Sequence, residues 1–210
     1  MSENKERIKK IKWVVLFICL ICFLAIAEDV LEDEIFNADI SFYNFLSEHV
    51  ISDSLTPIVK VITNFGGIVC LVILAILSFV IIKNKKIGLA IIGNLGISAF
   101  LNYILKIILQ RPRPTGYRLI EETGYSFPSG HSMASMAFYG FFIYLVYKNV
   151  KNKYAKWGLI TVLSLLIISI GLSRVYLGVH YLSDVLGGFL VTISYLIIYI
   201  QLIKDFIFEK

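Results

Sequence analysis

The chain has 210 residues, enough for one domain of ordinary size, and we expect a single domain spanning residues 1–210. Hydrophobic residues make up 58% of the chain and its mean hydropathy is +0.79, which excludes a water-soluble globular protein. The formal net charge is +5, but the basic residues form short clusters between apolar runs, a pattern that is typical of membrane proteins and argues against a nucleic-acid partner.

Six apolar runs approach the roughly 20 residues that a helix needs to cross a bilayer. They cover residues 13–27, 55–82, 87–109, 129–147, 157–172 and 180–203. We therefore predict an all-α fold, a bundle of six transmembrane helices. The first run, with its basic start and Ala25-Ile26-Ala27, also resembles a cleavable signal peptide. We favour a retained anchor, because an even number of spans places both termini on the same, basic side.

Between the first two runs, residues 35–50 alternate large apolar side chains with polar ones. This pattern predicts an interfacial amphipathic helix between transmembrane helices 1 and 2. Two roles stay open for this helix: it covers the entrance for a lipid, or it packs on the bilayer surface.

Lysines and arginines in short loops mark the cytoplasmic side of a membrane protein. Lysine-rich clusters lie at residues 5–12, 83–86 and 148–156, whereas residues 28–53 are acidic. We therefore expect a multi-pass plasma-membrane protein with both termini in the cytoplasm. By alternation, residues 110–128 and 173–179 face outward, although they contain four of the five arginines. Arginine suits bidentate capture of phosphate, so these four arginines indicate an anion site on the extracytoplasmic side.

Two blocks of polar residues stand at the predicted outer helix ends. In the first, Lys106 is followed after six residues by Arg113-Pro114; taken alone, Lys106 could simply extend to the interface. The second block, Pro128-Ser129-Gly130-His131, opens the fourth run, with Ser129 as a plausible N-cap. Unpaired backbone N–H groups at a helix N-terminus bind phosphate. A lone histidine in this position is more often structural than catalytic.

A third block consists of Ser173-Arg174, five further residues, His180, three more residues and Asp184. If His180 and Asp184 both lie on a helix, a spacing of four places them on one face. A carboxylate that accepts a hydrogen bond from one ring nitrogen makes the other nitrogen a better nucleophile. Because all three blocks lie at outer helix ends, they can converge on one pocket.

The three blocks resemble, in order and spacing, the signature motifs of the type 2 phosphatidic acid phosphatases, membrane members of the acid phosphatase and haloperoxidase superfamily. The resemblance implies that His180 attacks phosphorus, that Asp184 orients His180, and that His131 protonates the leaving group. It also implies that no metal ion or other cofactor takes part. The residues that the resemblance assigns to the phosphate oxygens are Lys106, Arg113, Ser129, Gly130 and Arg174.

We therefore expect a metal-independent lipid phosphatase that forms a phosphohistidine on the extracytoplasmic side. The substrate could be undecaprenyl pyrophosphate, phosphatidylglycerophosphate or phosphatidic acid, since the motifs bind phosphate and do not distinguish the tail. A phosphotransferase with the same intermediate is the alternative, whereas a nonenzymatic lipid carrier would leave the His-Asp pair without a purpose. The expected partners are the lipid substrate and the bilayer, with no obligate protein partner. Arg111 and Arg118 are expected to assist headgroup binding or interfacial anchoring.

Overall fold

A computed structural model describes residues 2–32, 35–116 and 118–208, and the side chains from residue 10 onward in these ranges. Asp33 and Glu34 of the acidic segment, and the side chains of the basic cluster before Lys10, lie outside this description. The regular elements of the described ranges are eight helices, which confirms the all-α prediction. They are α1 (Ser2–Leu31), α2 (Asn37–His49), α3 (Thr56–Asn64), α4 (Ile68–Ile81), α5 (Lys85–Leu109), α6 (Gly130–Asn149), α7 (Lys153–Tyr176) and α8 (Leu182–Phe208).

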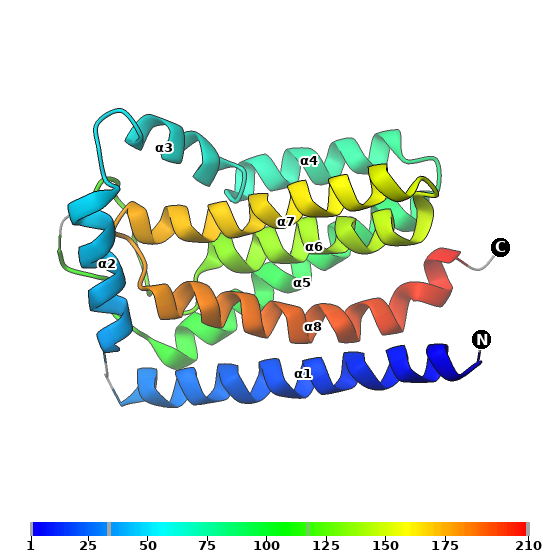
Figure 1. Cartoon of the computed structure of the whole chain (residues 1–210), viewed down its shortest axis with the longest axis horizontal. Helices are drawn as coiled ribbons and strands as arrows, with labels where there is room; N and C mark the ends of the chain where they lie inside the picture. Colours follow the sequence, from blue (N-terminus) through cyan, green and yellow to red (C-terminus); the bar gives the residue numbers. More distant parts are fainter. Residues whose placement is uncertain (1, 33–34, 117, 209–210) are drawn as a thin grey trace.

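The long helices run roughly parallel to one axis. α6 lies at the centre of the bundle, where it packs against α4, α5, α7 and α8. α1 lies along α8, and α3 packs on α7. Figure 1 shows that α1 begins and α8 ends at one end of the bundle, while α2 stands across the opposite end. The loops that contain the lysine clusters 83–86 and 148–156 lie at the end away from α2.

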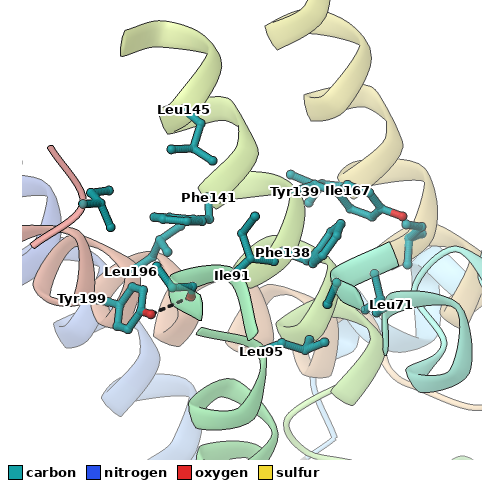
Figure 2. Packing of buried hydrophobic residues seen from close by; sticks show 14 residues of the cluster. Leu71, Ile91, Leu95, Phe138, Tyr139, Phe141, Leu145, Ile167, Leu196 and Tyr199 are labelled. Atoms are coloured by element: carbon teal, nitrogen blue, oxygen red, sulfur yellow. Dashed lines mark hydrogen bonds between the residues drawn. The ribbon is translucent and has the colours of Figure 1, made fainter. Parts of the chain in front are cut away.

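The main apolar core forms between α5, α6, α7 and α8 (Figure 2), with Phe141, Ile91 and Ile170 fully enclosed. Several polar groups on the helices of this core find partners inside the bundle. The Tyr199 hydroxyl, for example, donates to the Ala90 carbonyl at 2.6 Å. Such pairing is required because an apolar environment offers no water to replace a missing hydrogen bond.

Four helices in the described ranges are long and apolar enough to cross a membrane: residues 10–31 of α1, and α5, α7 and α8. The pair α3 and α4 adds a fifth if it is counted as one bent span. The 20-residue α6 is not among them, because it is the central helix and its polar N-terminal half faces other helices. The count of six spans therefore remains a prediction. The helix predicted within residues 35–50 is present as α2, and its interfacial position remains a prediction too.

The prediction of one continuous helix over residues 55–82 is wrong. α3 ends at Asn64 and α4 begins at Ile68, and their axes differ by 46°. At the break, a Cβ atom on Gly66 would lie 2.4 Å from Cγ2 of Ile170 and 3.3 Å from Cδ2 of His131. Since no side chain fits at this distance, the glycine lets the break pack directly on α7 and on the start of α6.

Replacing Gly66 with alanine is therefore expected to force α3 and α7 apart and to lower the free energy of unfolding by about 1–3 kcal/mol, the usual cost of overpacking. The matched control is Gly96→Ala in α5, where an added Cβ meets no atom within 4 Å. Thermal unfolding of the detergent-solubilised proteins measures both effects. Equal melting temperatures for Gly66→Ala and Gly96→Ala would contradict this account of the break.

Candidate active site

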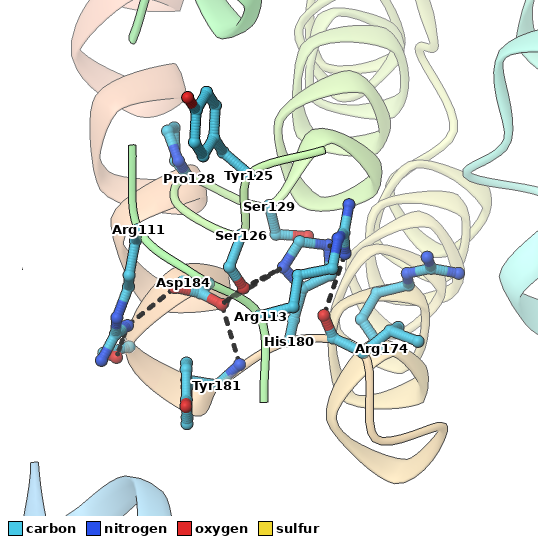
Figure 3. A network of polar contacts seen from close by, with 12 residues as sticks. Arg111, Arg113, Tyr125, Ser126, Pro128, Ser129, Arg174, His180, Tyr181 and Asp184 are labelled. Carbon is cyan, nitrogen blue, oxygen red and sulfur yellow. Dashed lines mark hydrogen bonds and ion pairs between the residues drawn. The ribbon is translucent and has the colours of Figure 1, made fainter. Parts of the chain in front are cut away.

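The three blocks meet at the end of the bundle where α5 and α7 finish, α6 and α8 begin, and α2 stands across (Figures 1 and 3). This alternation of helix ends places the side chains of Arg113, Arg174, His180 and Asp184 in one buried polar cluster. The sequence separates these residues by up to 71 positions, so the convergence is a product of the fold.

His180 lies in the turn between α7 and α8, and not on α8 as the four-residue spacing led us to expect. Its Nδ1 is nevertheless 3.2 Å from Oδ2 of Asp184, because the turn folds back over the first turn of α8. The Tyr181 backbone N–H also donates to this oxygen, at 2.8 Å, and so does the Ser126 hydroxyl. Asp184 has no solvent exposure, and these bonds fix the position of its carboxylate.

Arg113 lies on the other side of the imidazole. Its Nη1 is 3.1 Å from Nε2 of His180 and donates to the Val179 carbonyl at 2.9 Å. Further bonds to the carbonyls of Gly124 and Thr123, both at 3.0 Å, hold the guanidinium in place. Arginine only donates, so Nε2 must be the accepting nitrogen and Nδ1 must carry the proton toward Asp184. The lone pair of Nε2 therefore points into the cationic side of the site.

Burial lowers the pKa of His180 to about 4, and the positive charges of Arg113 and Arg174 act in the same direction, while Asp184 opposes them. The imidazole is consequently neutral at neutral pH. A neutral imidazole with one nitrogen held by a carboxylate is the form that can act as a nucleophile.

Arg174 is buried near the end of α7, with Nη1 bonded to the Thr63 hydroxyl at 2.9 Å and Nη2 to a carboxylate oxygen of Glu122. Its Nε has no hydrogen-bond acceptor among the described residues. The second oxygen of Glu122 is 3.9 Å from Nη2 of Arg113. Glu122 thus lies between two arginines, where an anion is expected. Sequence reasoning missed this residue, since nothing distinguishes it from the adjacent Glu121 in the loop.

Lys106 does not simply extend to an interface. Its Nζ donates to the carbonyls of Tyr125 and, at 3.3 Å, Ser126, so it ties the end of α5 to the loop before the second block. Its ammonium group is still close enough to the arginines and to Asp184 to interact with them electrostatically. The structure therefore brings Lys106 to the site, on its α5 side.

Ser129 is the N-cap of α6, as predicted, and its hydroxyl oxygen accepts from the Ser132 N–H at 3.4 Å. Its own backbone N–H donates to the Asp184 carbonyl at 3.0 Å, and the assignment of Ser129 to the phosphate oxygens remains a prediction. The N–H groups of Gly130 and His131 follow in the first turn, where an α-helix offers them no partner of its own. They are the α6 groups that remain for an anion.

His131 stands in the first turn of α6, against the break between α3 and α4, where a Cβ on Gly67 would lie 3.8 Å from its Nε2. The charges of Arg174, His180 and Arg113 act on this imidazole, so it belongs to the same cluster. It also lines an apolar groove of about 570 Å³ formed mainly by α4. His131 thus connects the polar cluster with an apolar surface.

The buried position of Arg111 contradicts our expectation that this residue assists headgroup binding or interfacial anchoring. It is 4% exposed and paired with Asp39 at 3.2 Å and Asp184 at 2.7 Å. Asp39, which we placed in an acidic outer segment, is likewise buried, on α2. Arg118 donates from Nε to the Pro114 carbonyl at 2.7 Å and is half-buried.

The family model described as PAP2 superfamily matches residues 87–208, a segment that contains all three blocks. This chain belongs to the PAP2 superfamily. The resemblance to type 2 phosphatidic acid phosphatases is thereby confirmed.

A sequence match and a structural match, both from Bacillus subtilis, agree with this assignment. Phosphatidylglycerophosphatase B of strain 168 is 38% identical over 104 residues, a match that covers 49% of this chain and about half, 51%, of that protein. The crystal structure of the first transmembrane PAP2 type phosphatidylglycerolphosphate phosphatase from this organism superimposes with a TM-score of 0.79 at 27% identity. It covers 93% of this chain and 98% of the solved one.

A crystal structure of Aquifex aeolicus LpxE shares the fold at a TM-score of 0.62 and 22% identity, and covers 79% of this chain and 96% of the other. Together with the apolar helices, the PAP2 fold makes this chain a multi-pass membrane protein.

If Glu122 occupies the anion position, Glu122→Gln should tighten the binding of inorganic phosphate about fivefold, the equivalent of roughly 1 kcal/mol for a partly exposed ion pair. The physical reason is that phosphate no longer has to displace a carboxylate from Arg174. Isothermal titration calorimetry measures the affinity, and Glu121→Gln on the neighbouring exposed acid is the matched control. Identical affinities for the two variants would show that Glu122 does not compete for the site.

Proposed function

We propose that this chain is a metal-independent lipid phosphatase that works through a phosphohistidine on His180. The observation that carries this proposal is the arrangement of the imidazole: Nδ1 faces Asp184, and Nε2 faces Arg113. A nucleophilic nitrogen is thereby aimed at the cations that would hold a phosphate. The membership of the PAP2 superfamily and the sequence and structural matches in Bacillus subtilis support a lipid phosphatase.

In the first step, a phosphate enters between Arg113 and Arg174 and displaces the carboxylate of Glu122 and the Arg113 contact on Nε2. The Nε2 lone pair then forms a bond to phosphorus while the bond from phosphorus to the ester or anhydride oxygen breaks. His131, whose protonated form is favoured once the negative phosphate is bound beside it, gives its proton to the departing oxygen. Asp184 stabilises the positive charge that develops on the imidazole of His180.

In the second step, neutral His131 removes a proton from a water molecule, and the water oxygen attacks phosphorus. The phosphorus–nitrogen bond breaks, and inorganic phosphate leaves with the water oxygen as its fourth oxygen. His180 returns to its neutral form, and His131 is protonated again for the next cycle. Both half-reactions therefore use the same two histidines in exchanged roles.

Phosphoryl transfer requires mainly positioning and positive charge around the phosphate oxygens. Many phosphatases obtain this charge from divalent metal ions. Here Lys106, Arg113 and Arg174 supply three positive charges, and the backbone N–H groups of Gly130 and His131 add two more donors. This set of donors supports a reaction without a metal ion or other cofactor.

The surroundings of His131 support a lipid as the leaving group. The groove beside it is lined by apolar side chains of α4, including Ile68, Val69 and Ile73, all of them exposed. An acyl or prenyl chain could lie there while the phosphate reaches His180. The relatives in Bacillus subtilis are named for phosphatidylglycerophosphate, which is one of three candidates with undecaprenyl pyrophosphate and phosphatidic acid.

The distribution of basic residues supports an assignment of the membrane side on which the site lies. The site lies at the end of the bundle opposite the lysine clusters 83–86 and 148–156, and basic loops favour the cytoplasm. We therefore place the site on the extracytoplasmic side of the plasma membrane and both termini in the cytoplasm.

The decisive experiment measures inorganic phosphate released by the purified protein from the three candidate lipids in the presence of EDTA. Release from at least one lipid without any acceptor is expected, and it would separate hydrolysis from the alternative, transfer to a lipid or sugar hydroxyl. Activity that EDTA abolishes and magnesium restores would refute the metal-independent mechanism.

Replacing His180 with alanine should abolish turnover, a loss of at least about 1,000-fold, because no other group can form the intermediate. Acid-quench experiments with a ³²P-labelled substrate should trap an acid-labile, base-stable phosphoenzyme in the wild type and none in His180→Ala. His49→Ala, at an exposed position on α2, is the control and should retain the intermediate. Normal activity in His180→Ala would force a different nucleophile.

The lowered pKa of His180 predicts the pH range in which its imidazole takes up a proton. Since the pKa is about 4, the imidazole should stay neutral as the pH falls from 7 to about 5 and take up its proton only near 4. NMR of ¹³C-labelled histidine measures this directly, and a His180→Gln sample assigns the signal among the three histidines. A midpoint near the ordinary value of about 6.5 would contradict the effect of burial.

A further inference from the structure

A second polar cluster lies directly behind Asp184, on the side away from His180. It consists of Arg111, Asp39, Ser183 and Asp184, and all four are buried. Arg111 Nη1 donates to Asp184 Oδ1 and to the Ser183 hydroxyl, both at 2.7 Å, while Nη2 donates to Asp39 Oδ2 at 3.2 Å. Figure 3 shows Arg111 and Ser126 on opposite sides of the Asp184 carboxylate.

Ser183 binds both oxygens of the Asp39 carboxylate and accepts a hydrogen bond from Arg111. Its backbone N–H donates to Asp39 Oδ1 at 2.8 Å, and its hydroxyl donates to Asp39 Oδ2 at 2.6 Å. The Tyr181 ring covers the guanidinium of Arg111, with 4.2 Å between the guanidinium carbon and the ring centroid. Every element of the cluster is therefore held from more than one direction.

The charges of this cluster explain why Arg111 matters. Two buried carboxylates, Asp39 and Asp184, share one guanidinium. Arg111 is the cation paired directly with both carboxylates in the part of the chain that the structure describes. Without it, two carboxylates so close together and out of water repel each other, and we expect one of them to take up a proton. If Asp184 were the protonated one, it would accept less strongly from Nδ1 of His180. The nucleophile would then lose its orientation.

We propose that Arg111 and Asp39 are positioning residues for the phosphoryl-transfer reaction, acting through Asp184 on His180, and that α2 is thereby a working part of the active site. This inference rests on the proposed function. Arg111 fixes the charge and direction of Asp184, and Asp39 fixes Arg111. Because Asp39 belongs to α2, docking of this helix and orientation of the nucleophile depend on the same ion pairs.

A purely structural role is the competing explanation, in which the cluster only attaches α2 to the bundle. The two explanations differ in how substitutions combine. If the cluster serves attachment alone, losses from Arg111 and Asp39 variants accumulate. If it controls the charge on Asp184, removing the Asp39 charge should repair part of the damage caused by removing Arg111, because Asp184 then remains the one carboxylate.

The experiment compares the wild type, Arg111→Met, Asp39→Asn and the double variant, with Lys60→Met on an exposed α3 position as the matched control. Arg111→Met should lower kcat about 100-fold with KM nearly unchanged, since the fault lies in orientation and not in binding. Asp39→Asn should lower kcat less, because its amide oxygen still accepts from Ser183. The double variant should be about tenfold faster than Arg111→Met.

Wild-type kcat in Arg111→Met, or no recovery in a double variant whose melting temperature equals that of Arg111→Met, would overturn the proposal. Should Arg111→Met fail to fold, the variant Arg111→Lys tests the same proposal. A lysine keeps the charge but cannot bridge both carboxylates, so a lower kcat at constant KM supports the proposal and a wild-type kcat overturns it.

Infrared difference spectroscopy supplies a readout that does not depend on turnover. A carbonyl band of a protonated carboxylic acid should appear in Arg111→Met and be absent from the wild type and the double variant. Its absence from folded Arg111→Met would refute the charge argument, even if no lipid phosphate were cleaved. Failure of the wild type to release phosphate would instead refute the proposed function.

Discussion

The site depends on one carboxylate that is fully removed from solvent. Asp184 accepts bonds from Ser126, Tyr181 and Arg111, and it faces His180. Its backbone carbonyl accepts from the Ser129 N–H, so the first turn of α8 is also bonded to the N-cap of α6. A buried charge in an apolar bundle is tolerated only with such partners. Supplying them brings together three segments of the chain: the residues after α5, the loop before α6 and the turn into α8. The geometry around His180 therefore follows from the hydrogen bonds that the buried Asp184 carboxylate requires.

The sequence predicts that these residues converge, because their spacing marks helix ends. Lysine, arginine and histidine are costly inside apolar runs, so their places at the boundaries already indicate a common function. The same reasoning placed His180 on a helix, where it does not lie. A four-residue spacing is compatible with a tight turn before a helix as well as with the helix itself, and only tertiary packing distinguishes the two.

Contacts between distant segments were beyond the reach of the sequence. Arg111 and Asp39 are 72 positions apart, and each alone is an ordinary charged residue near a predicted interface. Glu122 looks the same as Glu121 until Arg174 is placed beside it. The break at Gly66 was hidden for another reason: hydropathy records the apolar character of residues 55–82, but not the steric contact with α7 that interrupts the helix.

The position of Glu122 has a consequence for selectivity among lipids. A membrane is filled with phosphodiesters, each carrying one negative charge, and a carboxylate also carries one. A diester that replaced Glu122 between Arg113 and Arg174 would gain no charge in the exchange. A terminal phosphate carries about −1.5 to −2 at neutral pH and does gain. If the proposed function holds, the resident carboxylate would favour terminal phosphates over the abundant phosphodiesters of the membrane.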